Sequence, residues 1–93
     1  MDERIGIAGS FDSNDCLVTI KKADKLTITI DSIVKDYFYE AILDTVKKAL
    51  EEKNVSKDSM NISVEVQDKG ALDFTIRARV LTALKRYEKG GNK

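Results

Sequence analysis

Apolar and polar side chains alternate along much of the chain, and this pattern predicts the strands. The alternation is regular in residues 16–22, 25–30 and 60–67, and the short apolar stretch 5–10 can form an edge strand. A period of two residues combined with β-branched side chains is typical of β-strands. Residues 22–25 (KADK) then predict a short hairpin connection between the second and third strands. The side chains expected to face the core are Cys16, Val18, Ile20, Leu26, Ile28, Ile30, Met60, Ile62, Val64 and Val66.

Two other segments repeat their apolar positions every three or four residues, which indicates amphipathic helices. The first runs from Ser32 to about Lys53, and Asp31 or Ser32 is suited to be its N-cap, because a side-chain oxygen there accepts from a free backbone N–H. The second, residues 70–89, alternates like a strand at its start, but its helical pattern lasts longer and its composition favours a helix. The apolar helix positions are Val34, Phe38, Ala41, Ile42, Val46, Ala49 and Leu50, then Leu72, Ile76, Val80, Ala83, Leu84 and Tyr87.

The resulting order of elements is β-β-β-α-β-α, which predicts an α+β fold, with a small mixed β-sheet and two helices packed on one face. A chain of 93 residues suffices for a single domain, which we expect to be ordered from about residue 4 to 88, with 89–93 as a flexible tail. Such a domain buries one modest core and leaves no room for an enclosed active-site cavity.

Composition narrows the functional classes. The 16 basic and 16 acidic residues balance, which argues against nucleic-acid binding, because such proteins usually carry a basic excess. No apolar run approaches the roughly 20 residues of a membrane span, so no membrane contact is expected. A single cysteine, Cys16, cannot form an intramolecular disulfide, and a cytoplasmic location follows as the expectation.

The residues that most enzymes use for catalysis are scarce in this chain. Histidine is absent, which excludes a Ser-His-Asp triad, a Cys-His pair and every histidine-based zinc site. One cysteine also excludes thiolate zinc sites and CxxC redox pairs, and the glycine-rich phosphate loops are missing. We therefore expect the chain not to be an enzyme, and we assign no catalytic or metal-binding residues.

The segment GSFDSND (residues 9–15) lies between the first two predicted strands. Asp, Ser and Asn favour turns because their side chains bond locally to the backbone, and on residue chemistry alone this structural interpretation suffices. A serine on an exposed turn is also accessible to a modifying enzyme, which would have to activate the hydroxyl, because an unassisted hydroxyl is a poor nucleophile. From residue types alone, both a purely structural turn and a site of serine modification stay open.

Three other features have a functional interpretation. DSIV (residues 31–34) resembles the phosphopantetheine attachment motif of ordinary acyl carrier proteins, but those carriers are helical bundles, and a helix cap is the preferred interpretation. Cys16 is expected to be an inert core thiol rather than a reactive one. Arg77 and Arg79 of IRAR can grip a phosphate or a partner's carboxylate, although such arginines are more often solvated or paired with nearby acids.

Two segments, AGSFDSND (residues 8–15) and VQDKGALDFTIRARVLTAL (residues 66–84), resemble the acyl carrier subunit (gamma chain) of bacterial citrate lyase. The resemblance extends from about Ile5 to Arg86, nearly the whole chain. Its most specific part is DKGALD followed by IRAR, and the two segments in this order strengthen each other.

The resemblance implies a prosthetic group and its attachment residue. The family's acid-Ser-x-Asp motif falls on Asp12, Ser13, Asn14 and Asp15, so Ser13 would carry 2'-(5''-phosphoribosyl)-3'-dephospho-CoA through a covalent phosphodiester bond. Ser10, three residues away, is the alternative attachment residue. The thiol of the prosthetic group would hold the acetyl group as a thioester, and the protein itself would be a non-catalytic carrier.

The resemblance also implies partners. The citrate lyase alpha subunit (acyl transferase) would exchange acetyl for citryl and release acetate. The beta subunit (citryl lyase) would then cleave the citryl group to oxaloacetate and regenerate the acetyl-carrier. A prosthetic-group transferase and an acetyl ligase would prepare the carrier. We hypothesise that the transferase recognises Asp12 and Asp15 through a metal ion or basic side chains, because both flank the serine.

Two alternatives remain beside the citrate lyase carrier. The acyl carrier subunit of malonate decarboxylase looks similar and uses the same prosthetic group, although the full DKGALDFTIRAR run favours citrate lyase. The other alternative is a cofactor-free protein-interaction module, for which Ser13→Ala should leave function intact.

Overall fold

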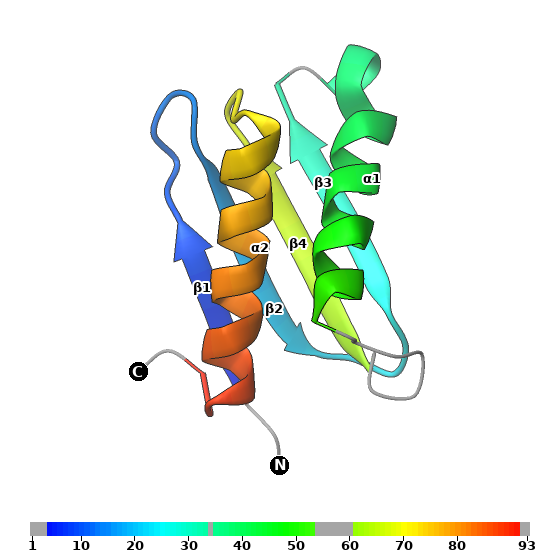
Figure 1. Ribbon diagram of the computed structural model, residues 1–93, viewed down its shortest axis with the longest axis vertical. Coiled ribbons are helices and arrows are strands. Elements are labelled where there is room, and N and C mark those ends of the chain that lie inside the picture. The colour runs from blue at the N-terminus through cyan, green and yellow to red at the C-terminus, as the bar shows by residue number, and fades with distance from the viewer. Residues whose placement is uncertain (1–3, 34, 54–60, 92–93) are drawn as a thin grey trace.

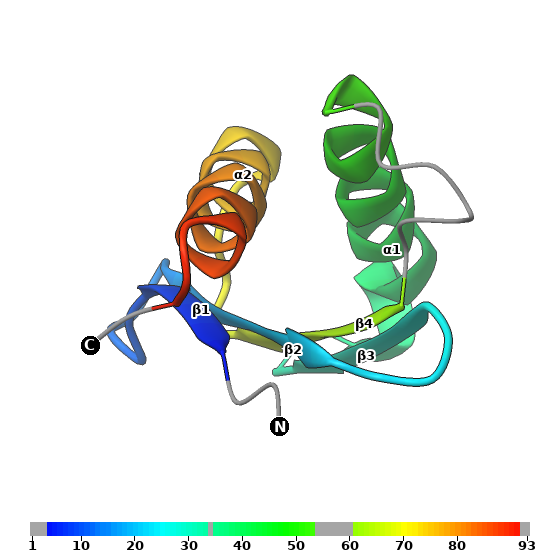
Figure 2. The ribbon, with the colours of Figure 1, turned by 90° about the horizontal axis from the view of Figure 1, so that it is seen from below.

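The computed structural model describes residues 4–33, 35–53 and 61–91, with their side chains except those of 35–37. One face of a mixed four-stranded sheet is covered by two helices, which confirms the predicted α+β class and element order (Figures 1 and 2). The elements are β1 (Ile5–Gly9), β2 (Cys16–Lys22), β3 (Thr27–Ser32), α1 (Lys35–Glu52), β4 (Ile62–Asp68) and α2 (Asp73–Glu88). Across the described ranges, neither helix combines the length and hydrophobicity needed to cross a bilayer.

The strand order is β1-β2-β4-β3, with β1–β2 and β2–β4 antiparallel and β3–β4 parallel. The predicted hairpin at residues 22–25 was therefore wrong, because β4 lies between β2 and β3. The chain passes from β3 through α1 to β4, and a helical crossover of this kind lets two strands run parallel side by side. β4 suits the central position because its inward residues Ile62, Val64 and Val66 are all buried under the helices.

The core confirms the period-two pattern. Cys16, Val18 and Ile20 of β2 are fully buried, while the residues between them are partly exposed. The helices contribute the buried residues Ile42, Val46, Ala49, Leu50, Ile76, Val80, Ala83, Leu84 and Tyr87. Three further apolar helix positions, Phe38, Ala41 and Leu72, are exposed instead. Val34 and Met60, also expected in the apolar pattern, lie outside the described residues.

α1 begins later than the sequence pattern predicts. Asp31 and Ser32 belong to β3, so neither caps the helix, which starts at Lys35. Ser32 pairs with Asp68 in the parallel ladder, and its hydroxyl donates a hydrogen bond to the Asp68 carboxylate at 2.7 Å. Because of this long-range bond, the Ser32 side chain does not form the cap of α1 that the sequence pattern predicts.

α2 packs closely against β1, and the contact requires a glycine. A Cβ built on Gly6 would lie 2.1 Å from the carbonyl oxygen of Ala83 and 2.7 Å from the backbone nitrogen of Tyr87. Any larger residue at this position would push the helix away from the edge of the sheet.

Candidate modification site

Residues 10–15 form the loop that connects β1 to β2, at the end of the sheet where α2 begins (Figure 1). The loop starts at Gly9, whose φ is +100°, and a Cβ there would lie 1.8 Å from the Cys16 carbonyl oxygen. Within the loop Asn14 has a φ of +66°, a conformation that Asn tolerates better than most residues. The turn expected from these residue types is therefore confirmed.

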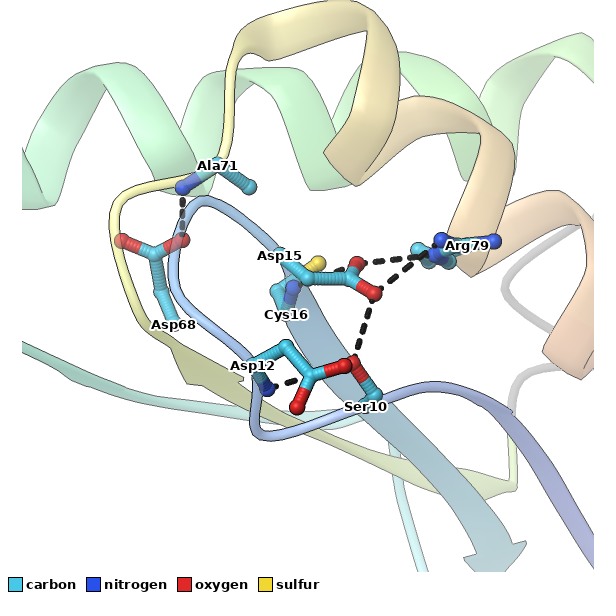
Figure 3. Close-up of polar contacts among 7 residues, drawn as sticks. All are labelled: Ser10, Asp12, Asp15, Cys16, Asp68, Ala71 and Arg79. Atoms are coloured by element: carbon cyan, nitrogen blue, oxygen red, sulfur yellow. Dashed lines mark hydrogen bonds and ion pairs between the residues drawn. The ribbon is translucent and has the colours of Figure 1, made fainter.

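Asp15 joins the loop to α2. Its Oδ2 accepts a hydrogen bond from the Ser10 hydroxyl at 2.8 Å, and its Oδ1 accepts one from the Cys16 N–H at 2.7 Å (Figure 3). Arg79 of α2 donates to both oxygens, from Nε at 3.0 Å and from Nη2 at 3.1 Å. These bonds, above all those from Arg79, lower the pKa of Asp15 from 3.8 to about 2, although partial burial opposes the change. The carboxylate thus stays ionised and fixes the loop against the helix.

The loop is also fastened to the turn between β4 and α2. The N–H of Asn14 donates to the Lys69 carbonyl, and the N–H of Lys69 donates to the Asp15 carbonyl, both at 2.9 Å. The two segments that carry the family resemblance, residues 8–15 and 66–84, therefore lie against each other at one end of the sheet.

Asp68 holds the β4–α2 turn in place. Only 2% of its surface is exposed, and its carboxylate accepts a hydrogen bond from the Ser32 hydroxyl at 2.7 Å. The same carboxylate accepts a second hydrogen bond from the Ala71 N–H at 2.8 Å (Figure 3). A buried carboxylate is tolerated only when its oxygens find hydrogen-bond donors. Asp68 therefore links the end of β3 to the turn that leads into α2.

The serines at this end differ in the state of their hydroxyl groups. Ser10 is half-buried, and its Oγ both donates to Asp15 and accepts from the Asp12 N–H at 3.2 Å. Ser32 uses its hydroxyl on Asp68. Ser13 is exposed, and its hydroxyl forms no hydrogen bond within the part of the chain that the structure describes.

The other candidates have structural roles. Cys16 is fully buried, and burial raises the pKa of its thiol to about 12, which confirms the prediction of an inert core cysteine. Arg77 forms an ion pair with Glu52, and Arg79 forms one with Asp15. Both arginines of IRAR are therefore paired with acidic residues of the same chain. Within the described ranges, no group of His, Cys, Asp and Glu side chains is arranged to hold a metal ion.

Sequence reasoning predicted the turn at residues 9–15, but it did not identify Asp68 as the residue that holds the neighbouring β4–α2 turn in place. A signal was present, because Asp68 continues the inward series of Ile62, Val64 and Val66, and an acid at a core position implies an internal partner. The pairing of Arg79 with Asp15 has no comparable local signal, since 64 positions separate the two residues.

Comparison with known proteins finds matches over nearly the whole chain. A family model described as "Malonate decarboxylase delta subunit (MdcD)" matches residues 3–87. A citrate lyase acyl carrier protein of Treponema denticola is 43% identical over 84 residues, covering 90% of this chain and 92% of the relative. The protein of that name from Pectobacterium atrosepticum is 42% identical over 85 residues, covering 90% and 84%, and that from Halothermothrix orenii is 34% identical over 89 residues, covering 95% and 90%.

A solved structure from Thermus thermophilus resembles this fold with a TM-score of 0.51. At 13% sequence identity the likeness concerns the fold alone, and the match covers 96% of this chain but 16% of that longer one.

These matches define the class of protein as a small acyl carrier protein with an α+β fold. Within that class, the chain belongs to the citrate lyase acyl carrier protein family. Its relatives are carriers by name rather than catalysts, in agreement with the resemblance inferred from residues 8–15 and 66–84.

Proposed function

We propose that this chain is the acyl carrier subunit of citrate lyase and that Ser13 is the residue that carries its prosthetic group. The observation that supports Ser13 is the contrast between its hydroxyl and those around it. The hydroxyls of Ser10 and Ser32 are engaged in internal hydrogen bonds, whereas that of Ser13 is exposed and unbonded to any described residue. A modifying enzyme can reach and reorient such a hydroxyl without breaking the fold.

The residues at this site fit a covalently attached 2'-(5''-phosphoribosyl)-3'-dephospho-CoA. The carrier needs a reactive thiol, and Cys16 cannot supply it, because it is buried and its pKa is raised to about 12. The prosthetic group, once bound, would supply that thiol and carry the acetyl and citryl groups as thioesters. Ser13 would contribute the oxygen of the phosphodiester bond.

The surrounding residues hold the attachment point without taking part in the chemistry. Attachment forms a bond between Ser13 Oγ and a phosphorus atom of the donor, and it breaks the bond between that phosphorus and a phosphate-type leaving group, which departs with the bonding electron pair. The proton of the Ser13 hydroxyl passes to a base. Asp15 is a poor base because its pKa is lowered to about 2 and its oxygens are occupied by Arg79, Ser10 and Cys16. We assign the base to the transferase, and Asp15 keeps the loop in position.

A flexible arm on a firmly held loop makes delivery to the partner subunits intramolecular. Tethering of this kind gives effective concentrations on the order of millimolar for a short linker. The alpha and beta subunits of citrate lyase are the proposed recipients, with a prosthetic-group transferase and an acetyl ligase as maturation enzymes in the cytoplasm. The ion pair between Asp15 and Arg79 holds the β1–β2 loop, and with it the proposed attachment residue, in a fixed position on the protein.

Malonate decarboxylase is the second candidate complex, because the matching family model carries the name of its delta subunit. Both candidates use an attached thiol, so they differ in the partner subunits that accept the carrier. The three relatives described above, at 34–43% identity, are named citrate lyase acyl carrier proteins, which favours the first.

Reconstitution tests the proposal directly. The loaded chain is combined with citrate lyase alpha and beta subunits, and oxaloacetate formed from citrate is measured with malate dehydrogenase. Ser13→Ala should abolish turnover, while the matched control Ser10→Ala should retain it. Turnover by Ser13→Ala would refute the site, and activity only with malonate decarboxylase subunits would refute the assignment to citrate lyase.

A further inference from the structure

The large apolar side chains that remain exposed collect around the loop that holds Ser13. Within the described residues, every large apolar side chain that is more than half exposed lies in one of four segments. These are the β1–β2 loop, the residue that follows β3, the first turn of α1 and residues 72–74 where α2 begins, and they lie at one end of the molecule (Figure 1). The residues are Phe11 (59%), Ile33 (68%), Phe38 (53%), Leu72 (62%) and Phe74 (69%), and we call this surface the apolar end.

Single exposed apolar residues need no explanation, but a cluster of five at one end does. Two open hollows lie in this surface. The first, of about 240 Å³, is lined in part by Phe11 and Ile33, and the second, of about 280 Å³, is lined in part by Phe38 and Leu72. Both are smaller than the pockets that usually enclose small molecules. They suit the protruding side chains of a protein partner.

Carboxylates without a counter-ion border the same surface. Asp31 lines the first hollow, Asp73 lines the second, and Asp12 directly precedes Ser13. All three are exposed, and none forms an ion pair with any residue that the structure describes. Lys69, an exposed cation, lines the first hollow beside Asp31. The apolar end is therefore complementary to an apolar surface with a basic rim.

An enzyme that modifies Ser13 must bring a phosphorus atom within bonding distance of its hydroxyl, and so must cover the surrounding surface. That enzyme also holds a donor rich in phosphate, which requires positive charge next to the reacting centre. We propose that the apolar end is the docking face for the prosthetic-group transferase, with Phe74 and Leu72 as apolar contacts and Asp12 and Asp73 against its basic rim. This inference rests on the proposed function, because it takes Ser13 as the modified residue.

Loading kinetics with matched variants test this docking face. Intact mass is followed over time with the purified citrate lyase prosthetic-group transferase and its donor, at several carrier concentrations, for Phe74→Ala and Asp73→Asn. The controls are Ile5→Ala and Glu88→Gln, an apolar and an acidic residue at the opposite end of the fold. Circular dichroism and thermal unfolding check that all variants fold.

We expect Phe74→Ala to lower kcat/KM about tenfold, mainly through a higher KM, as loss of a well-placed aromatic contact does. Asp73→Asn should lower it about threefold and weaken its dependence on salt, because the lost attraction is screened by ions. Both control variants should stay within about twofold of the wild type. Equal kinetics for Phe74→Ala and Ile5→Ala would overturn the docking face.

The same design separates the docking face from the proposed function. If the wild-type chain is loaded on Ser13 while Phe74→Ala is loaded equally well, the docking face is wrong and the carrier function stands. If a transferase active on a known carrier leaves the wild-type chain unmodified, the proposed function fails and the docking face fails with it. If Phe74→Ala weakens only the binding of the citrate lyase alpha subunit, the face belongs to that subunit and the proposal is overturned.

Discussion

The Asp15–Arg79 pair gives a quantitative prediction, because it fixes the β1–β2 loop to α2 through two parallel hydrogen bonds. The pKa of Asp15 is lowered from 3.8 to about 2, and each pKa unit corresponds to about 1.4 kcal/mol of stabilisation of the ionised form. The full shift corresponds to roughly 2.5 kcal/mol. Since 39% of the Arg79 side chain is exposed, solvent screening reduces the expected contribution to about 1–2 kcal/mol.

The sign of the pH dependence follows from the direction of the shift. A carboxyl group whose pKa is lowered by folding stabilises the fold above its ordinary pKa, here 3.8, and loses that contribution as the pH falls towards about 2. Asp15→Asn removes the charge with little change in size. We expect the wild type to be more stable than Asp15→Asn by about 1–2 kcal/mol at pH 6, and this difference should shrink towards pH 2.

Urea unfolding followed by circular dichroism between pH 6 and pH 2 measures this difference. Subtracting the two curves removes the contributions of the other carboxyl groups, which the two proteins share. Glu52→Gln is the matched control, because it breaks an ion pair with Arg77 on the exposed surface, away from the loop. A stability difference for Asp15→Asn that is independent of pH would refute the reasoning, as would additive effects of Asp15→Asn and Arg79→Gln in a double-mutant cycle.

Three further predictions concern residues of β1, of the β1–β2 loop and of β2. Gly6→Ala should destabilise the fold by about 1–3 kcal/mol in urea unfolding, because the new Cβ would lie 2.1 Å from the Ala83 carbonyl oxygen; unchanged stability would contradict that close approach. Ser10→Ala should cost about 1 kcal/mol through the lost hydrogen bond to Asp15, and full wild-type stability would contradict that role. Cys16 should resist a thiol reagent at pH 8 until urea unfolds the chain, whereas rapid labelling of the native protein would contradict its burial and raised pKa.

The elements were predictable because their signals are local. Alternation in β2 and β4, and the three-to-four-residue repeat in α2, each arise from a single face that must be buried, so the sequence pattern shows them directly. The end of β3 and the start of α1 were predicted wrongly because the Ser32 hydroxyl bonds to Asp68, a residue 36 positions away. The Ser32 hydroxyl can either cap a helix locally or bond to the distant Asp68 carboxylate. The sequence pattern around Ser32 indicates only the local cap.

The strand order was beyond local reasoning for the same reason. A short connection such as residues 22–25 favours a hairpin, but the burial of β4 in the centre of the sheet separates β2 from β3. At the candidate site, the sequence located the serine-containing turn through its residue types. Residue types alone do not distinguish the hydroxyls of Ser10 and Ser13, because the difference between them depends on Asp15, which accepts a hydrogen bond from the Ser10 hydroxyl.

Intact-mass analysis of the chain co-expressed with the citrate lyase maturation enzymes, followed by peptide fragmentation, tests the central claim most directly. Ser13→Ala and Ser10→Ala are analysed in parallel. The account predicts the added mass of one phosphoribosyl-dephospho-CoA group on Ser13, its retention in Ser10→Ala and its absence from Ser13→Ala. The group on Ser10 or Ser32, or an unmodified chain in the presence of enzymes that load a known carrier, would contradict it.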